Sequence, residues 1–373
     1  MKCGLCIPHC PSYWLTRSEA DSPRGRIALI QGVDAGDLAV SATLFAHLDG
    51  CLQCRACERV CPSQVPFGKI INQSLAELQP KAPLKTRLLN HILKPKTLNR
   101  LATLRQKLDG LPGLSKTWRW LRSGPVSHTA ETRRADTTEQ PSVVVLSGCV
   151  TQPLDPVTLL HTEKLLHFFG IRAQWSDGCC GALCFHNGQP ELAQQHVQQT
   201  AQHCPPEHPV LFLATGCGAF LKECHTHFPN APFQSLSQQS QDICDFLANL
   251  AWPTPQQTTQ YNVVIHTPCS AKNTLRETES AHRLLRRLPH LTLSTLTSPH
   301  CCGGAGSYTL KYPAHAEALI EHQLAELKAP YPDYLVTTNL GCALQFAASF
   351  KYHKIKTQVI HPLTLVAIAF GLA

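Results

Sequence analysis

The chain has 373 residues, of which 19 are cysteine and only one is methionine, and its formal net charge is +8. This length allows two or three domains with hydrophobic cores. An odd number of cysteines in a long chain without a secretory leader argues against a disulfide framework, so we expect a cytoplasmic protein that binds metal through clustered thiolates.

The opening segment, MKCGLCIPHCP, is typical of an iron–sulfur motif that lacks its first cysteine. Cys3, Cys6 and Cys10 have the spacing C-x2-C-x3-C-P, which is the later part of C-x2-C-x2-C-x3-C-P. Two interpretations stay open. Either the missing ligand lies upstream of Met1, or the site has three cysteines and tends to form a [3Fe–4S] cluster or to use water or another side chain.

A complete motif follows in CLQCRACERVCP. The first three cysteines of such a motif bind one cluster, and the fourth binds the other cluster of a pair. A zinc site is the alternative, but zinc sites rarely place three ligands so close together. The two predicted [4Fe–4S] clusters have as ligands Cys10, Cys51, Cys54 and Cys57 in one case, and Cys3, Cys6 and Cys61 in the other.

Residues 76–135 are strongly basic, with 13 Lys and Arg against 3 Asp and Glu. Leucines recur there at helical spacing between prolines, which predicts short amphipathic helices. The segment is either a solvated linker or a docking face for an acidic partner or anionic lipid head groups. No nucleic-acid-binding motif accompanies the charge, so a nucleic acid partner is not expected.

The rest of the chain repeats itself. Apolar runs rich in valine lead to Cys149 and, 120 residues later, to Cys269. Each is followed by a CCG sequence and then by a second apolar run that leads to Cys217 or Cys342. We expect these runs to be strands that end in the cysteines, with helices between them, so that each repeat is a parallel α/β unit.

Each repeat contains four cysteines that such a fold brings together. Adjacent cysteines are poor disulfide partners, because their Cα atoms are about 3.8 Å apart and disulfides need at least about 4.4 Å. Converging thiolates suit an Fe–S cluster or zinc. The candidate ligands are Cys149, Cys179, Cys180 and Cys217 in the first repeat, and Cys269, Cys301, Cys302 and Cys342 in the second. The cysteines without counterparts are predicted to be buried and structural, and these are Cys184, Cys204, Cys224 and Cys244.

The predicted fold class is α/β with a small α-helical ferredoxin-like N-terminal domain and duplicated α/β cysteine-rich (CCG) units. The predicted domains are a ferredoxin-like 2x[4Fe–4S] domain at 1–75, a basic helical linker at 76–140, and CCG repeats at 141–252 and 253–373. The longest apolar run, Leu363–Ala373, is too short to span a bilayer and predicts a terminal helix.

This combination of motifs resembles the iron–sulfur subunit of bacterial glycolate oxidase over essentially the full chain. The stretches that carry the resemblance are SPRGRIALI, CLQCRACERVCPS, GCCGA, TGCGAFLKE, HTPC, HCCGGAGSY and NLGCAL. The resemblance implies an electron-transfer subunit that works with FAD-containing flavoprotein subunits. Those partners oxidise glycolate to glyoxylate, and the clusters pass electrons toward a quinone or membrane-associated acceptor. It also implies a cytoplasmic protein, free or peripheral on the inner membrane, with no catalytic residue of its own.

Related families give the alternatives. The CCG repeats are also similar to those of iron–sulfur subunits for lactate or glycerol-3-phosphate oxidation and of heterodisulfide reductases. Heterodisulfide reductases end each repeat in C-x2-C. In this chain Phe220 and Gln345 stand where the second cysteine of that ending would be. The shortened ending argues against direct thiol–disulfide catalysis and favours a relay or structural cluster.

Several cations are candidates for tuning a negatively charged cluster, although each could equally be an ordinary surface charge. They are Arg24, Arg26, Arg55, Arg59 and Lys222. His266 precedes Cys269 by three residues and could orient or replace a ligand, or be a hydrogen-bonded core histidine.

Overall fold

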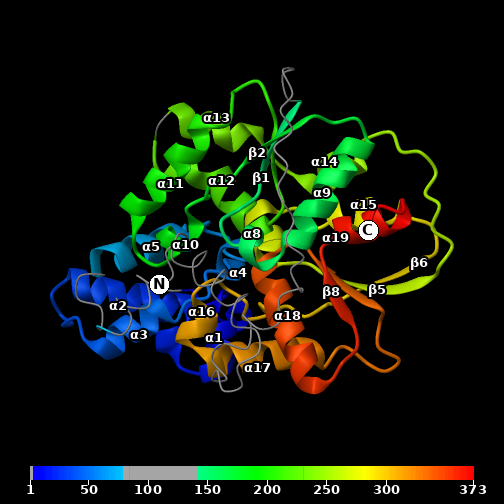
Figure 1. Ribbon diagram of the computed structural model, residues 1–373. Coiled ribbons are helices and arrows are strands. Elements are labelled where there is room, and N and C mark those ends of the chain that lie inside the picture. Colours follow the sequence, from blue (N-terminus) through cyan, green and yellow to red (C-terminus); the bar gives the residue numbers. More distant parts are fainter. Residues whose placement is uncertain (1–2, 79–83, 85–141, 230) are drawn as a thin grey trace.

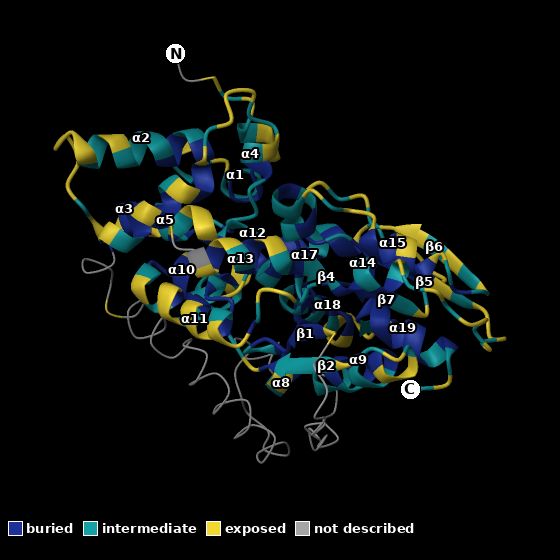
Figure 2. Ribbon diagram, turned by 90° about the horizontal axis from the view of Figure 1, so that it is seen from above, coloured by how far each residue is buried: buried dark blue, intermediate teal, exposed yellow. Residues whose placement is uncertain are grey.

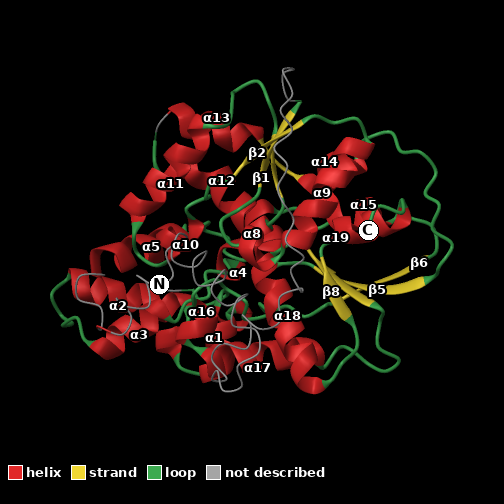
Figure 3. Cartoon of the chain, in the orientation of Figure 1, coloured by secondary structure: helices red, strands yellow, loops and turns green. Residues whose placement is uncertain are grey.

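The computed structural model describes residues 3–78, 84, 142–229 and 231–373. The strands of these residues form two four-stranded parallel sheets (Figures 1 and 3). In both sheets the second strand of the repeat lies at one edge, followed by the first, third and fourth. The matching order confirms the predicted duplication of an α/β unit.

The first sheet has the order β2-β1-β3-β4, and all its pairings are parallel. Its β1 has the sequence VVVL and is buried throughout, as expected for a β-branched run covered on both faces. The strands are β1 (Val143–Leu146), β2 (Ala173–Ser176), β3 (Val210–Phe212) and β4 (Ser240–Asp242). The helices are α8 (Thr151–Leu154), α9 (Pro156–Phe168), α10 (Ala182–His186), α11 (Pro190–Gln202), α12 (Thr215–His227), α13 (Ala231–Gln239) and α14 (Ile243–Ala248).

The second sheet has the order β6-β5-β7-β8 and is also parallel. Its strands are β5 (Tyr261–His266), β6 (Leu291–Thr295), β7 (Tyr334–Thr337) and β8 (Gln358–Ile360). A π-helical segment, Ser270–Leu275, follows β5. The α-helices are α15 (Ser280–Leu285), α16 (Tyr308–Lys311), α17 (Pro313–Leu324), α18 (Leu340–His353) and α19 (Pro362–Ala369).

One apolar core joins the two repeats. It contains side chains of both sheets together with α9, α14, α15 and α19, and Figure 2 shows α19 as largely buried. The predicted terminal helix is therefore present as α19, which packs inside the core, although it ends at Ala369 and leaves the last four residues of the segment non-helical. Within the described ranges, no helix combines the length and the apolar character needed to cross a bilayer.

The N-terminal part is helical. Its elements are two 3₁₀ turns (Ile7–His9 and Glu19–Asp21), α1 (Pro11–Thr16), α2 (Pro23–Asp34), α3 (Ala42–Asp49), α4 (Ala56–Arg59) and α5 (Phe67–Leu78). Phe45 and Ile71 lie in a small core that is separate from the sheets. Leu52 packs instead against Tyr308 and Leu319 of the second repeat, so the N-terminal part is attached to that repeat. The predicted basic linker lies almost wholly outside the described residues.

Candidate metal centres

Four cysteines from three short segments line one hollow in the N-terminal part. Cys10 immediately precedes α1, Cys51 and Cys54 lie between α3 and α4, and Cys57 lies within α4. The backbone of this loop adopts left-handed conformations at two positions beside the cysteines, which turn the chain around the hollow. The structure thus brings together the four cysteines predicted to share one cluster.

Burial disfavours ionisation of these thiols in the absence of a metal. It raises the pKa of Cys57 and Cys54 far above the ordinary value for a thiol, and neighbouring cysteines add to the effect. A bound metal offsets this cost, because metal ligation stabilises the thiolate. The donor set therefore fits a cluster with thiolate ligands.

Arg26 supports the same conclusion. Its side chain is 1% exposed, its Nη1 donates to Ser12 Oγ at 2.9 Å and to the Asp21 carbonyl at 2.5 Å, and its Nε donates to the His47 carbonyl at 2.6 Å. Its Nη2 has no hydrogen-bond partner among the described residues, and Arg26 lines the hollow. Burial raises the pKa of Cys51, whereas Arg26 opposes that rise. Asp21 Oδ1 lies 3.6 Å from Nη2, so the buried cation acts on both the Asp21 carboxylate and the negative charge of the hollow.

The cysteines predicted for the other cluster lie at the surface side of the N-terminal part. Cys3 is exposed, whereas Cys6 and Cys61 are partly buried. Burial raises the pKa of Cys6, and the nearby Cys10 and Cys61 raise it further. Arg24 Nη1 donates to the Cys3 carbonyl at 3.2 Å, so this cation lies beside the group.

In the first repeat, the four candidate cysteines meet at the carboxyl ends of the strands. Cys149 follows β1, and its Sγ is 3.4 Å from Cys179 Sγ. Hydrogen bonds link Cys180 to both Cys179 and Cys217. These bonds and burial raise the pKa of Cys180, whereas contacts with Cys149 and Cys180 lower that of Cys179.

The second repeat has the same arrangement. Cys269 Sγ is 3.7 Å from Cys301 Sγ, and Cys302 contacts both Cys301 and Cys342. The glycines that follow the paired cysteines, Gly181 and Gly303, have φ values of 83° and 84°. A Cβ at either position would lie under 3 Å from a backbone oxygen, so only glycine fits.

One prediction about the repeats was wrong in detail. Cys217 and Cys342 do not end strands, because each lies in the first turn of a helix, α12 or α18. The apolar periodicity after Cys217, with Phe220, Leu221 and Cys224 buried on one face, could have indicated this helix. A thiolate in the first turn of a helix is favoured by the helix dipole.

Comparisons with known proteins give the same division of the chain. Residues 1–66 match the family described as a 4Fe-4S dicluster domain, and residues 143–228 and 263–347 each match the family described as a cysteine-rich domain. The chain is 30% identical to the glycolate oxidase iron-sulfur subunit of Escherichia coli (strain K12), over 93% of this chain and 89% of that protein. It belongs to the glycolate oxidase iron–sulfur subunit family.

Other relatives agree. The probable glycolate oxidase iron-sulfur subunit of Bacillus subtilis (strain 168) is 27% identical over 100% of this chain and 93% of its own length. Lactate utilization protein A of Shouchella clausii (strain KSM-K16) is 23% identical over 59% of this chain and 96% of its own length. The predicted resemblance and fold class are therefore confirmed, and the chain is an iron–sulfur protein with a 4Fe-4S dicluster domain.

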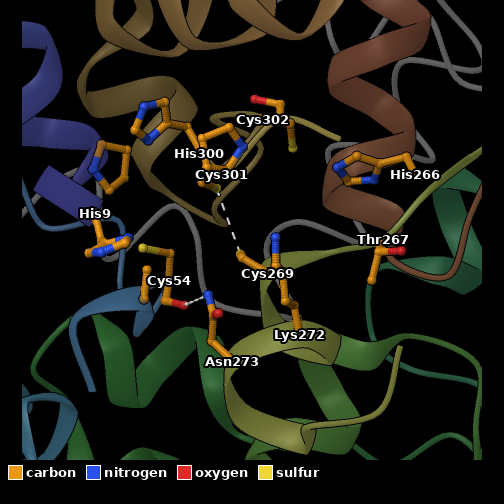
Figure 4. A pocket seen from close by; sticks show the side chains of 14 residues that line it. His9, Cys54, His266, Thr267, Cys269, Lys272, Asn273, His300, Cys301 and Cys302 are labelled. Carbon is orange, nitrogen blue, oxygen red and sulfur yellow. Dashed lines mark hydrogen bonds between the residues drawn. The ribbon is translucent and has the colours of Figure 1, made fainter. Parts of the chain in front are cut away.

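In this member of the family, the N-terminal hollow adjoins the second repeat. Cys54 lines a further hollow together with Cys269, Cys301 and Cys302, and Asn273 Nδ2 donates to the Cys54 carbonyl at 2.7 Å (Figure 4). This contact could not be predicted from local sequence patterns, because the two cysteine sets are more than 200 residues apart. Cys54 thus lies between two candidate metal centres.

The remaining tuning candidates differ in their surroundings. Arg55 pairs with Glu58 and with Glu223 of α12, so its charge is already compensated. Burial lowers the pKa of Lys222. The four cysteines without counterparts are all buried, as predicted.

Replacing Arg26 is expected to shift the reduction potential of the adjacent cluster. Removal of a buried cation destabilises the more negative reduced state, so Arg26→Met should lower the midpoint potential by on the order of 50 mV. Arg26→Lys keeps the charge and should lower it less. Redox titration followed by EPR measures both. Equal potentials in all three proteins would show that Arg26 has only a structural role.

Proposed function

We propose that this chain is the electron-transfer subunit of a glycolate dehydrogenase. FAD-containing partner subunits oxidise glycolate to glyoxylate and take up two electrons. This chain accepts those electrons one at a time and passes them toward a quinone or another membrane-associated acceptor. It works on the cytoplasmic side of the membrane and has no substrate chemistry of its own.

The proposed ligands follow the spacing of the cysteine motifs, and the shared hollow supports the first set. One [4Fe–4S] cluster takes Cys10, Cys51, Cys54 and Cys57, and the other takes Cys3, Cys6 and Cys61. Each CCG repeat holds a further Fe–S cluster or zinc on its own four cysteines. The domain limits are 1–75 for the ferredoxin-like part, 76–140 for the linker, and 141–252 and 253–373 for the repeats.

The observation that carries the relay is the position of Cys54. It lines the hollow of the first cluster and also faces Cys269 and Cys301. Because Cys54 lines both hollows, it provides a short path for an electron between the N-terminal cluster and the metal centre of the second repeat. A chain of redox centres requires neighbouring centres to lie close together. Structural zinc sites carry no electrons and do not require this proximity.

The test compares the flavoprotein subunits alone with the complex that contains this chain. Reduction of a quinone analogue by glycolate should depend on the chain and should bleach the cluster absorbance. Equal rates without the chain would contradict the relay. Lactate is the second candidate donor, because the lactate utilization relative matches over 59% of this chain. Faster bleaching with lactate than with glycolate would reassign the substrate and keep the relay.

A further inference from the structure

The two repeats differ at one position beside their cysteines. Leu146 ends β1 and pairs in register with Phe212, whereas His266 ends β5 and pairs in register with Thr337. The first cysteine of each repeat follows three residues later. The first repeat therefore has two apolar side chains where the second has a histidine and a threonine.

His266 lies among the sulfurs of the second repeat. A ring nitrogen of His266 and the Sγ atoms of Cys302 and Cys342 all lie within 4.8 Å of one another, and all three residues are buried. Figure 4 shows His266 and Cys302 lining the same hollow. His266 Nδ1 is 3.0 Å from Thr337 Oγ1, which fixes the ring, and no hydrogen bond to Nε2 is present among the described residues. A ligating histidine is usually oriented in this way by a hydrogen bond to its other nitrogen.

We propose that His266 is a metal ligand, so that the centre of the second repeat has a nitrogen donor that the first repeat lacks. This inference rests on the proposed metal binding by the cysteines of the second repeat. Where His266 binds the metal in place of one of the four thiolates, the centre has one negative charge fewer, which raises the reduction potential when the metal is iron in a cluster. Imidazole together with thiolates is equally a common donor set for zinc.

Packing alone does not account for this histidine. His266 lies edge-on to Phe346 at a ring separation of 4.9 Å, so it does contribute to the core. However, the first repeat fills the matching position with Leu146, which is 2% exposed and packs beside Cys180. A leucine thus satisfies the same sheet position when no nitrogen donor is needed.

The test measures metal retention in the full chain, purified anaerobically. Total iron and zinc per chain are counted before and after exposure to EDTA. His266→Leu gives the second repeat the residue of the first, and it should release the second-repeat metal at least about tenfold faster than the wild type. His266→Cys restores a donor and should retain the metal. Release at the wild-type rate from His266→Leu, or equally fast release from His266→Cys, would overturn the inference.

Cys302→Ala/Cys342→Ala removes half of the cysteines of the second repeat and separates the failure of this inference from that of the proposed metal site. If this double variant contains as much metal as the wild type, the second repeat holds no metal and both proposals fail there. If it lacks metal that His266→Leu retains as tightly as the wild type, only the role of His266 fails. Melting midpoints measured by circular dichroism identify any variant that does not fold. If His266→Leu does not fold, metal retention in His266→Cys compared with the wild type tests the role of His266.

Discussion

The double variant Cys54→Ala/Cys57→Ala is expected to lose one complete cluster, which is about four iron atoms per chain. Both cysteines line the same hollow, and burial keeps their thiols from ionising without a metal. Among the described residues that line this hollow, only Cys10 and Cys51 would remain as thiol donors, which is too few to hold the cluster. Electron transfer from glycolate to the acceptor should fall by more than about 100-fold. Loss of an outer-shell partner costs up to about 100-fold in metal affinity or activity, and loss of two direct ligands should cost more.

Iron analysis and EPR of the anaerobic protein measure this effect. Cys204→Ala is the matched control, because Cys204 is buried, its pKa is raised to about 11 by burial, and it lines neither hollow. The control should keep its iron and its activity. Wild-type iron content in the double variant would contradict the proposed ligand set.

The second large effect is expected at a buried ion pair between the N-terminal part and the second repeat. Lys311 Nζ lies 2.7 Å from Asp49 Oδ1, and both side chains are 6% exposed. Asn187 Oδ1 of the first repeat accepts from the same Nζ at 2.9 Å, and the Tyr312 hydroxyl donates to Asp49 at 3.2 Å. This network joins all three parts of the described structure.

Asp49→Ala should therefore destabilise the protein by about 3–5 kcal/mol, because it leaves the Lys311 ammonium buried without its counter-ion. Thermal unfolding of the anaerobic protein should show a midpoint lower by on the order of 5–10 °C. The double variant Asp49→Leu/Lys311→Met removes both charges and should recover most of the loss. A single variant as stable as the wild type would show that the pair is dispensable.

The sequence was sufficient for the parts of the fold that depend on local patterns. The C-x2-C-x2-C-x3-C-P spacing predicted a dicluster domain, and the valine-rich runs before Cys149 and Cys269 predicted the first strand of each parallel unit. The apolar spacing in 157–170 and 313–328 likewise predicted helices, which the structure contains as α9 and α17 with slightly different ends. These features depend on residues that are close in the chain.

Features that depend on how these parts pack could not be predicted. Nothing near Cys54 indicates that it faces Cys269, because this contact arises from the packing of Leu52 against the second repeat. The helical position of Cys217 was missed because a short apolar run before a cysteine is compatible with either a strand or a strand followed by a helix. The pairing of His266 with Thr337 required the register of β5 with β7.

If this chain is an electron relay, electrons from glycolate must reach its clusters. Low-temperature EPR of the anaerobically purified complex with its flavoprotein subunits, before and after addition of glycolate, detects this transfer. Glycolate should produce signals of reduced [4Fe–4S] clusters, or bleach an oxidised [3Fe–4S] signal if the Cys3, Cys6 and Cys61 site has three ligands. Spectra that are unchanged by glycolate, in a complex whose clusters dithionite reduces, would show that the chain is not the relay for glycolate oxidation.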